Sequence, residues 1–447
     1  MTSPSSQSAG LSNLDLLPSA QLPEFEIDGV QPRYAVAPAD PGEVGEVLRQ
    51  AQSHKLSVIP FGSGTKRDWG NLLRGYDVAV STSRLDRVSE YEPQDLVVKV
   101  QAGCRLSVLQ KALAPDRLWL PLDPPRSQEG TLGGLVATRA SGPSRFGYGT
   151  IRDYLLGLTV VQADGTKTKF GAKVVKNVTG YDLCKLYAGS FGTLGVMTDF
   201  YFKLKPMPPF CSTVVVLVKQ PSDGSPAVRQ LFSSPLMPLC FEWLSPEAFS
   251  VLNDKLALVE GRTGFAFFLR FGDVEKAVRW QIQELERLWE PFCAKGVVMS
   301  SDSAEQDYLW GLLREDQPFL RSGLTWAKIR ISALPSDLTE ISTEIQEFRA
   351  AWGGEVLFKA HAGNGVFQVY CGSADLERDG MQLAEYIGGL RQRLKAQRGS
   401  AVLEWAPRWL KERIDVWGLD SKERILMQRI KARYDPTGIL NPGRFVV

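Results

Sequence analysis

The chain has 447 residues, 44% hydrophobic and 23% charged, a length that predicts two or three domains rather than one core. A formal net charge of only +2 without a long basic run gives no electrostatic support for nucleic-acid binding. No apolar stretch approaches the roughly 18 residues of a membrane span, and no two of the six cysteines form a Cys-x-x-Cys pair. This pattern argues against direct membrane insertion, and against a zinc site or an iron–sulfur cluster held by this chain.

The first half of the chain is predicted to be a polar tail followed by alternating helices and strands. Residues 1–25 lack the basic-then-apolar pattern of a leader and are expected to be a disordered tail. Beyond the tail we predict a helix over 41–53, strands near 58, 78 and 96–100, a helix over 103–113, and strands over 156–161 and 196–202. Asp164-Gly165 is typical of a hairpin turn.

A proline-rich segment at 205–209 predicts a domain boundary near residue 207. Beyond it we predict strands over 213–218, 265–271, 327–334 and 366–370, and amphipathic helices over 275–289, 336–351 and 375–398. The alternation indicates an antiparallel sheet with helices on one face, an α+β cap domain over 208–400. A last helix over 421–434 lies in a C-terminal segment, 401–447.

Glycine-rich segments stand far apart in the chain, at 60–65 (Pro-Phe-Gly-Ser-Gly-Thr), 130–134 (Gly-Thr-Leu-Gly-Gly) and 189–195 (Gly-Ser-Phe-Gly-Thr-Leu-Gly). Glycine lets backbone amides approach a diphosphate closely and adopts angles that other residues avoid. Two or more such loops predict one elongated anionic ligand held at several points.

The first loop matches neither a Rossmann loop nor a P-loop, since Arg67 stands where a third glycine would be needed and no Gly-Lys-Ser/Thr is present. A strand signal comes next, at 77–81, where a Rossmann unit would begin a helix. The phosphates would therefore rest on the amides of the loop itself. An ordinary Gly-Ser turn is the structural alternative for this loop taken alone.

Taken in order with 441–443 (Asn-Pro-Gly), these segments resemble the vanillyl-alcohol oxidase superfamily of flavoproteins. The resemblance covers about residues 30–207 and the C-terminal tail. Segments 144–149 and 176–182 are most similar to the FAD-binding E-type subunits of glycolate oxidases. The resemblance implies a two-subdomain FAD-binding domain of the p-cresol methylhydroxylase type over 26–207. It also implies the α+β cap and a C-terminal segment that returns to the flavin.

The resemblance implies FAD as cofactor and distributes its contacts over all the glycine-rich segments. The diphosphate contacts are Phe61, Gly62, Ser63, Gly64 and Thr65, with Lys66 or Arg67 adding charge. The other implied contacts are Gly130, Thr131, Gly133 and Gly134 in the second loop, Ser141, Gly142, Arg145 and Tyr148 near the flavin or its ribityl chain, Gly192 and Val196 on the adenine side, and Asn441 in the tail. A turn hydroxyl is the alternative role for Ser141.

The flavin is predicted to be non-covalent. Many members of the superfamily attach FAD through a histidine or cysteine near these loops, but His54 and His361, the two histidines of the chain, lie outside the flavin motifs. Cys104 and Cys184 are the alternative attachment points, although neither fits a recognised attachment pattern.

Oxidation of a 2-hydroxy acid needs a cation for the carboxylate and a base for the hydroxyl proton. Arg330, on a predicted cap strand, is the candidate cation, with an ordinary ion-paired arginine as the alternative. His361, in Ala-His-Ala-Gly-Asn-Gly, is the candidate base and resembles a His-Ala-Gly-Asp-Gly-Asn segment of the catalytic glycolate oxidase subunit. The Glu-His-Gly of those relatives corresponds here to 403–406, which has no histidine. Because a lone imidazole is a poor divalent-metal site, no metal is predicted.

Three interpretations stay open. The chain is an FAD-dependent oxidoreductase subunit that oxidises glycolate or another 2-hydroxy acid by hydride transfer, or a flavin-carrying electron-relay or assembly subunit, or a nucleotide-binding structural protein. The resemblance implies a second flavoprotein subunit and an iron–sulfur subunit as partners. It also implies a cytoplasmic location, either free or peripheral to the membrane through those partners.

Overall fold

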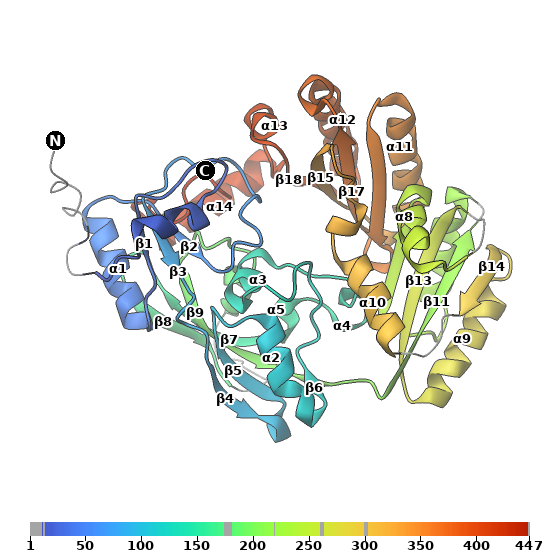
Figure 1. The fold of residues 1–447 in the computed structure, drawn as a ribbon, viewed down its shortest axis with the longest axis horizontal. Helices are drawn as coiled ribbons and strands as arrows, with labels where there is room; N and C mark the ends of the chain where they lie inside the picture. The colour runs from blue at the N-terminus through green and yellow to red at the C-terminus, as the bar shows by residue number, and fades with distance from the viewer. Residues whose placement is uncertain are drawn as a thin grey trace.

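The computed structural model describes residues 11, 14–173, 181–218, 220–259, 263–298 and 303–445. Two lobes lie side by side in Figure 1: the N-terminal half of the chain forms one and the segment from β11 to β18 forms the other. The red C-terminal helix α14 (Ser421–Tyr434) lies with the blue N-terminal elements, so the chain ends on the lobe where it began.

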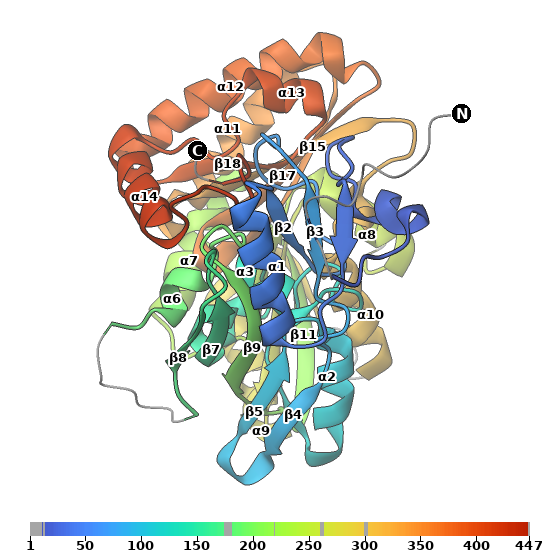
Figure 2. The same cartoon turned by 90° about the vertical axis from the view of Figure 1, so that its left-hand side faces the viewer.

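The first subdomain is a small parallel sheet of β1 (Tyr34–Val36), β3 (Val78–Ser81) and β2 (Val58–Phe61), in that order. Helix α1 (Pro41–Ser53), in front in Figure 2, begins where the Asp40 carboxylate accepts hydrogen bonds from the amides of Gly42 and Glu43. The C-terminal tail extends this sheet, because the Val58 amide donates to the Ile439 carbonyl and the Asn441 amide donates to the Val58 carbonyl, both at 2.8 Å. The predicted return of the tail is therefore confirmed.

The second subdomain is a five-stranded antiparallel sheet. Its strands, in spatial order, are β4 (Val88–Glu92), β5 (Val97–Gln101), β9 (Val196–Lys203), β7 (Leu155–Val161) and β8 (Lys167–Gly171). Its helices are α2 (Leu106–Leu113), α3 (Leu132–Thr138), α4 (Arg145–Tyr148), α5 (Ile151–Tyr154) and α6 (Cys184–Tyr187). The expected turn at Asp164-Gly165 joins β7 to β8, with Gly165 at a φ of +79°.

The second lobe is an eight-stranded antiparallel sheet. The strand order is β14 (Cys293–Val298), β11 (Phe210–Val218), β13 (Phe265–Asp273), β12 (Cys240–Leu244), β16 (Glu355–His361), β17 (Val366–Ser373), β15 (Thr325–Ser332) and β18 (Ser400–Trp405). Two further short strands, β6 (Leu118–Trp119) and β10 (Lys205–Pro206), pair just before the junction of the lobes.

Helices cover both faces of this sheet, which corrects the expectation of a single covered face. On one face lie α7 (Gly224–Phe232), α9 (Glu275–Trp289), α11 (Leu338–Ala351) and α12 (Leu376–Ala396); on the other lie α8 (Pro246–Leu256) and α10 (Ser303–Arg314). The physical reason is that the inner strands carry apolar side chains on both faces of the sheet. In β11, for example, Val214 and Val216 pack into one core, and Val215 and Leu217 pack into the other.

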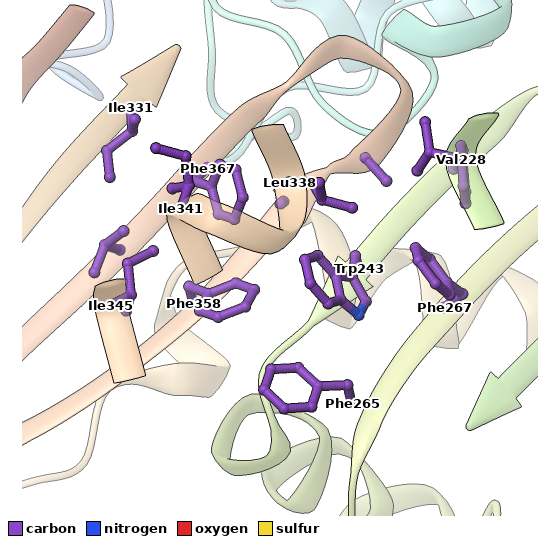
Figure 3. Close-up of a cluster of buried hydrophobic side chains, with 14 of the residues drawn as sticks. Val228, Trp243, Phe265, Phe267, Ile331, Leu338, Ile341, Ile345, Phe358 and Phe367 are labelled. Atoms are coloured by element: carbon purple, nitrogen blue, oxygen red, sulfur yellow. The ribbon is translucent and has the colours of Figure 1, made fainter. Parts of the chain in front are cut away.

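The larger core is built around aromatic rings. Figure 3 shows Trp243 beside Phe267, and their ring centroids are 5.5 Å apart with nearly parallel planes. Phe358 contributes an edge contact to the same indole at 5.6 Å. The strands β12, β16 and β17, which contribute to this core, also carry the polar site residues.

The predicted fold class is confirmed. Besides the covering of both faces, the cap has four strands that were not predicted, β12, β14, β16 and β18, and the structure differs from the predicted domain limits in two places. Residues 19–25, expected in a disordered tail, form a 3-10 turn, Ser19–Phe25, in which Phe25 is buried against Phe61. Residues 400–405, most of them assigned to the C-terminal segment, form the edge strand β18 of the cap; only α13 (Arg408–Arg413) and the residues after it return to the first lobe. Most of the segment 176–182, on which the family resemblance partly rests, lies outside the described residues.

Candidate active site

Three adjoining cavities run from the N-terminal segment to the junction of the lobes. The outer one, about 920 Å³, is lined from 17–25, 81–86 and 103–108. It shares Phe61, Gly62, Ser63, Arg67 and Thr131 with a middle cavity of about 100 Å³. The middle cavity shares Lys66 and Thr138 with an inner one of about 40 Å³. Because neighbouring cavities have walls in common, the three form a path suited to one elongated ligand.

The first glycine-rich loop forms the wall between the outer and middle cavities. A Cβ on Gly62 would lie 2.3 Å from Thr131 Oγ1, and Gly64 has a φ of +70°, so a side chain at either place would be strained or would clash. Thr131 caps α3 by accepting a hydrogen bond from the Gly134 amide at 3.3 Å. The structure thus brings together eight of the predicted cofactor residues: Phe61, Gly62, Ser63, Gly64, Thr65, Thr131, Gly134 and Asn441.

The residues of the middle cavity fit a bound FAD. Ser63 Oγ and Asn441 Oδ1 are buried, lack a hydrogen-bond partner among the described residues, and belong to residues that line this cavity. Groups of this kind normally have partners, so a polar ligand is the expected one. Asn441 is held in place by donating its amide N–H to the Phe191 carbonyl. Arg444 fixes the tail further, since its guanidinium donates to the Arg67 carbonyl at 2.6 Å.

Other predicted cofactor residues lie away from the lining of the path and pack the loops instead. A Cβ on Gly133 would lie 2.9 Å from that of Ala102, one on Gly142 would lie 1.8 Å from the Asp123 carbonyl oxygen, and one on Gly192 would lie 3.2 Å from the Pro60 ring. The Gly130 carbonyl accepts from the Leu106 amide, and Val196 is a buried residue of β9. These glycines allow close backbone contacts that shape the cavities.

Tyr148 lines a separate cavity of about 470 Å³ at the lobe junction. Its ring meets that of Trp119 edge to face at 5.2 Å. Arg145, three residues earlier, and Ser141 line the inner cavity, and the Arg145 guanidinium donates to Ser141 Oγ at 3.1 Å. The motif around α4 is therefore divided between two cavities.

The inner cavity is strongly cationic. Its lining includes the cationic side chains Lys66, Arg139, Arg145, Lys328 and Arg330, against the single carboxylate of Glu404. Burial lowers the pKa of Lys66, and burial followed by repulsion from Arg330 lowers the pKa of Arg145. Such crowding of like charge is relieved by an anion, so the cavity favours a negatively charged ligand group.

Arg330 projects from β15 into this cavity, and its side chain is 38% exposed. Its Nε lies 3.2 Å from Glu404 Oε1, close enough for an ion pair but without hydrogen-bond geometry, and Nε has no hydrogen-bond partner among the described residues. Arg330 is therefore ion-paired with Glu404, as the alternative interpretation expected. Its Nε–H still has no hydrogen-bond acceptor among the described residues and could donate to a ligand carboxylate.

His361 ends β16 and is 3% exposed. Its Nδ1 lies 2.6 Å from Glu242 Oε1, and its Nε2 lies 3.1 Å from the Gln368 amide nitrogen. An amide nitrogen only donates, so Nε2 accepts, and the ring proton sits on Nδ1, where it is donated to Glu242. Burial first, then Arg145 and Lys359, hold the pKa of His361 well below its usual value. Burial raises the pKa of Glu242 well above its usual value.

A buried charge cluster supports the inner cavity from behind. Lys328 Nζ lies 3.0 Å and 3.1 Å from the two oxygens of Asp316, and 3.1 Å from Glu404. Lys359 donates to the carbonyls of Leu313 and Glu315 at 3.0 and 2.8 Å, and burial lowers its pKa to about 8. The Tyr370 hydroxyl donates to Asp316 at 2.6 Å. The carboxylates of Asp316 and Glu404 thus hold Lys328, and carbonyls at the end of α10 hold Lys359, with each lysine side chain only 2% exposed.

Sequence reasoning missed Glu242, Gln368, Lys328 and Glu404. Their common signal is a polar residue inside an otherwise apolar strand, as in Cys-Phe-Glu-Trp-Leu at 240–244, since such a residue is buried only with a partner. Within the described residues, no group of three or more His, Cys, Asp or Glu side chains could hold a metal ion. The same residues include no helix long and apolar enough to cross a membrane.

Comparison with known proteins gives two family matches that together span most of the chain. Residues 32–171 match the FAD binding domain family, and residues 207–402 and 411–445 match the C-terminal domain family of FAD linked oxidases. The chain is 26% identical over 431 residues to glycolate oxidase subunit GlcD of Bacillus subtilis, covering 92% of this chain and 88% of the relative. It is 28% identical over 404 residues to glycolate oxidase subunit GlcE of Escherichia coli, covering 89% and 95%.

Two further similarities complete the comparison. A D-lactate dehydrogenase of Anaerostipes hadrus is 26% identical over 427 residues, covering 93% of this chain and 89% of the relative. A crystal structure of p-cresol methylhydroxylase superposes with a TM-score of 0.75 at 15% identity, covering 96% of this chain and 93% of that one, which shows a shared fold. The domain matches and the cavity path together show that this chain belongs to the FAD linked oxidases and is an FAD-dependent oxidoreductase.

Proposed function

We propose that the protein oxidises glycolate or another 2-hydroxy acid, with FAD bound non-covalently along the cavity path. The observation that carries this proposal is the inner cavity, where five cationic side chains and a buried imidazole surround one small space. A carboxylate and a hydroxyl on adjacent carbons match that set of groups. Relatives named glycolate oxidase subunit and D-lactate dehydrogenase agree with this substrate class.

The side chains divide the work by their chemistry. When bound, FAD supplies the acceptor for the hydride that leaves the substrate carbon. Arg330 and Arg145 bind and orient the substrate carboxylate, and their charge keeps it in the inner cavity. His361 Nε2, which accepts a hydrogen bond from Gln368 in the free site, takes the proton of the substrate hydroxyl. Ser63 and Asn441 bind the cofactor side of the path.

Replacing Arg330 with Met is expected to weaken binding of the acid. A hydrogen bond to a charged group contributes about 1.5–3 kcal/mol, so the Kd of the acid for the oxidised protein should rise by roughly 10- to 150-fold. Flavin content should be unchanged, because Arg330 is absent from the lining of the outer and middle cavities. The measurement is the anaerobic reduction rate as a function of acid concentration. An unchanged half-saturation concentration would contradict the assignment of Arg330.

Acid precipitation is expected to release all the flavin into the supernatant. His54 does not line any of the three cavities. Both ring nitrogens of His361 are hydrogen-bonded, Nδ1 to Glu242 and Nε2 to Gln368. Cys104 lines the outer cavity, but burial raises its pKa to about 11, which keeps the thiol protonated and a poor nucleophile. Yellow colour retained in the washed pellet would show a covalent link, with Cys104→Ser as the variant that tests its position.

A second candidate function is a flavin-carrying relay or assembly subunit without an efficient substrate site. It is favoured by the small inner cavity, about 40 Å³, and by Gln368, which already donates a hydrogen bond to His361 Nε2.

Under either function, we propose that electrons leave through partners, an iron–sulfur subunit and a second flavoprotein subunit, since the described residues hold no cluster-ligating group. The isolated chain is then expected to turn over glycolate slowly with a dye acceptor, and co-expression with such partners to restore the rate. Rapid dye-linked turnover by the lone chain would contradict the need for partners.

A further inference from the structure

The Glu242–His361 pair is the most deeply buried ionisable pair at the inner cavity. The two side chains are 1% and 3% exposed, and their contact of 2.6 Å joins the centre of β12 to the end of β16. The register of the two strands places Glu242 directly opposite His361, so the contact is built into the sheet. A carboxylate held this way fixes both the tautomer and the orientation of the imidazole.

From this geometry we infer that Glu242 is the final acceptor of the substrate's hydroxyl proton, which reaches it through the His361 ring. The inference rests on the proposed function and goes beyond it by assigning a proton store outside the substrate cavity. Glu242 is absent from the lining of that cavity, so it acts through His361 as a positioning residue.

The proton transfer is set by the hydrogen bonds in the free site. Gln368 donates to Nε2, the ring proton is on Nδ1, and Glu242 is the carboxylate that accepts it. The substrate hydroxyl replaces the Gln368 amide at Nε2 and its O–H bond breaks, so that a proton is bonded to Nε2. The Nδ1–H bond then breaks, and that proton bonds to Glu242 Oε1. The ring ends neutral, with its hydrogen on Nε2, and Glu242 ends as a carboxylic acid.

The electrons balance in the same step. The pair from the broken O–H bond forms the second bond of the new carbonyl group, and the pair from the C–H bond leaves with the hydride to FAD. One 2-hydroxy acid becomes one 2-oxo acid, one proton is stored on Glu242, and no further reactant is needed.

The surrounding charges favour this end state over a protonated imidazole. Arg145 on α4, Lys328 on β15 and Lys359 on β16 are the cations that face His361, and Asp123 is the facing anion. Burial, Arg145 and Lys359 lower the pKa of His361, and burial raises the pKa of Glu242, so the two shifts act in the same direction on a proton shared by the pair. A proton that enters the pair is therefore more stable on the carboxylate than on the ring.

Glu242→Gln tests the inference because the amide oxygen still accepts the Nδ1–H hydrogen bond but cannot take the proton. Anaerobic reduction of the bound flavin by the acid should slow by about 10²-fold or more, with little change in the half-saturation concentration of the acid. Its pH dependence should also differ from that of the wild type. Glu242→Asp should recover part of the rate. The matched control is Glu247→Gln, which makes the same change in α8 at a glutamate paired with Arg349, away from the inner cavity.

Infrared difference spectroscopy of the wild-type holoprotein gives a readout that does not depend on how the variant folds. Reduction by the acid should produce a new protonated-carboxyl C=O band, absent in Glu242→Gln. An equal rate and pH profile in Glu242→Gln, or no such band on reduction of the wild type, would overturn the inference. A wild-type flavin that no 2-hydroxy acid reduces would instead refute the proposed function, which separates the two failures.

Discussion

Replacing Gly64 with Val is expected to give a folded protein that purifies with less than about one tenth of the FAD per chain of the wild type. Gly64 has a φ of +70°, a conformation that costs a β-branched residue on the order of 1–2 kcal/mol. Its Cβ would also lie 3.0 Å from two ring atoms of Phe61, which lines both the outer and the middle cavity. The loop would have to move where its amides meet the diphosphate.

Gly323→Val is the matched control. Gly323 has a φ of +82°, similar backbone strain, and open space around its Cβ, and it lies in the second lobe before β15. It should therefore lose comparable stability and keep its flavin. Flavin content is read from the absorbance ratio of the purified proteins, and stability from thermal unfolding. Stoichiometric FAD in Gly64→Val would show that this loop does not bind the diphosphate.

Replacing Asp316 with Asn is expected to lower the free energy of unfolding by about 3–5 kcal/mol, because it leaves buried charges without their partner. Asp316 contacts Lys328 at 3.0 Å and Lys359 at 3.5 Å, and each lysine side chain is 2% exposed. An exposed pair, Arg279 with Glu275, gives the control: Glu275→Gln should cost less than about 1 kcal/mol. Denaturant unfolding of the two variants measures both values.

The Asp316 effect should depend on pH in one direction. Burial raises the pKa of Asp316, but the attraction of Lys328, Lys359 and Lys66 together lowers it by a larger amount. The pKa of Asp316 in the folded protein therefore lies below its usual value. A carboxyl with a lowered pKa contributes stability that is complete above its unfolded value, about 4, and is lost as the pH falls toward its folded value. The difference between wild type and Asp316→Asn should therefore stay constant from about pH 5 to 7 and shrink below about pH 4. A difference that grows on acidification would contradict this assignment.

Much of the fold was predictable because its signals are local. The alternation and length of apolar runs placed β11, β13, β15 and β17 and the long helices of the cap, and the glycine positions predicted the loop at 61–65 that lines the cavities. The two-sided covering of the cap sheet was missed. Continuous apolar strands show that both faces are buried but do not say which helix covers each face.

The site was predictable only in part, and the reason is physical. The residues 61–65 lie together because they are consecutive, whereas Glu242 meets His361 from a position 119 residues earlier in the chain, through the pairing of β12 with β16. Glycines at 130, 133, 142 and 192 carry the same local signal as Gly62 and Gly64, yet they do not line any of the three cavities of the path. Local sequence indicates a close approach at a glycine without saying what approaches it.

The most direct test of the proposed function is the visible absorbance spectrum of the purified protein before and after anaerobic addition of a 2-hydroxy acid, with glycolate first and D-lactate and D-2-hydroxyglutarate next. The protein should be yellow as isolated, and at least one of these acids should bleach the flavin absorbance without any added acceptor. A flavin that dithionite reduces but that all three acids leave oxidised would contradict the proposed substrate class and favour the relay function.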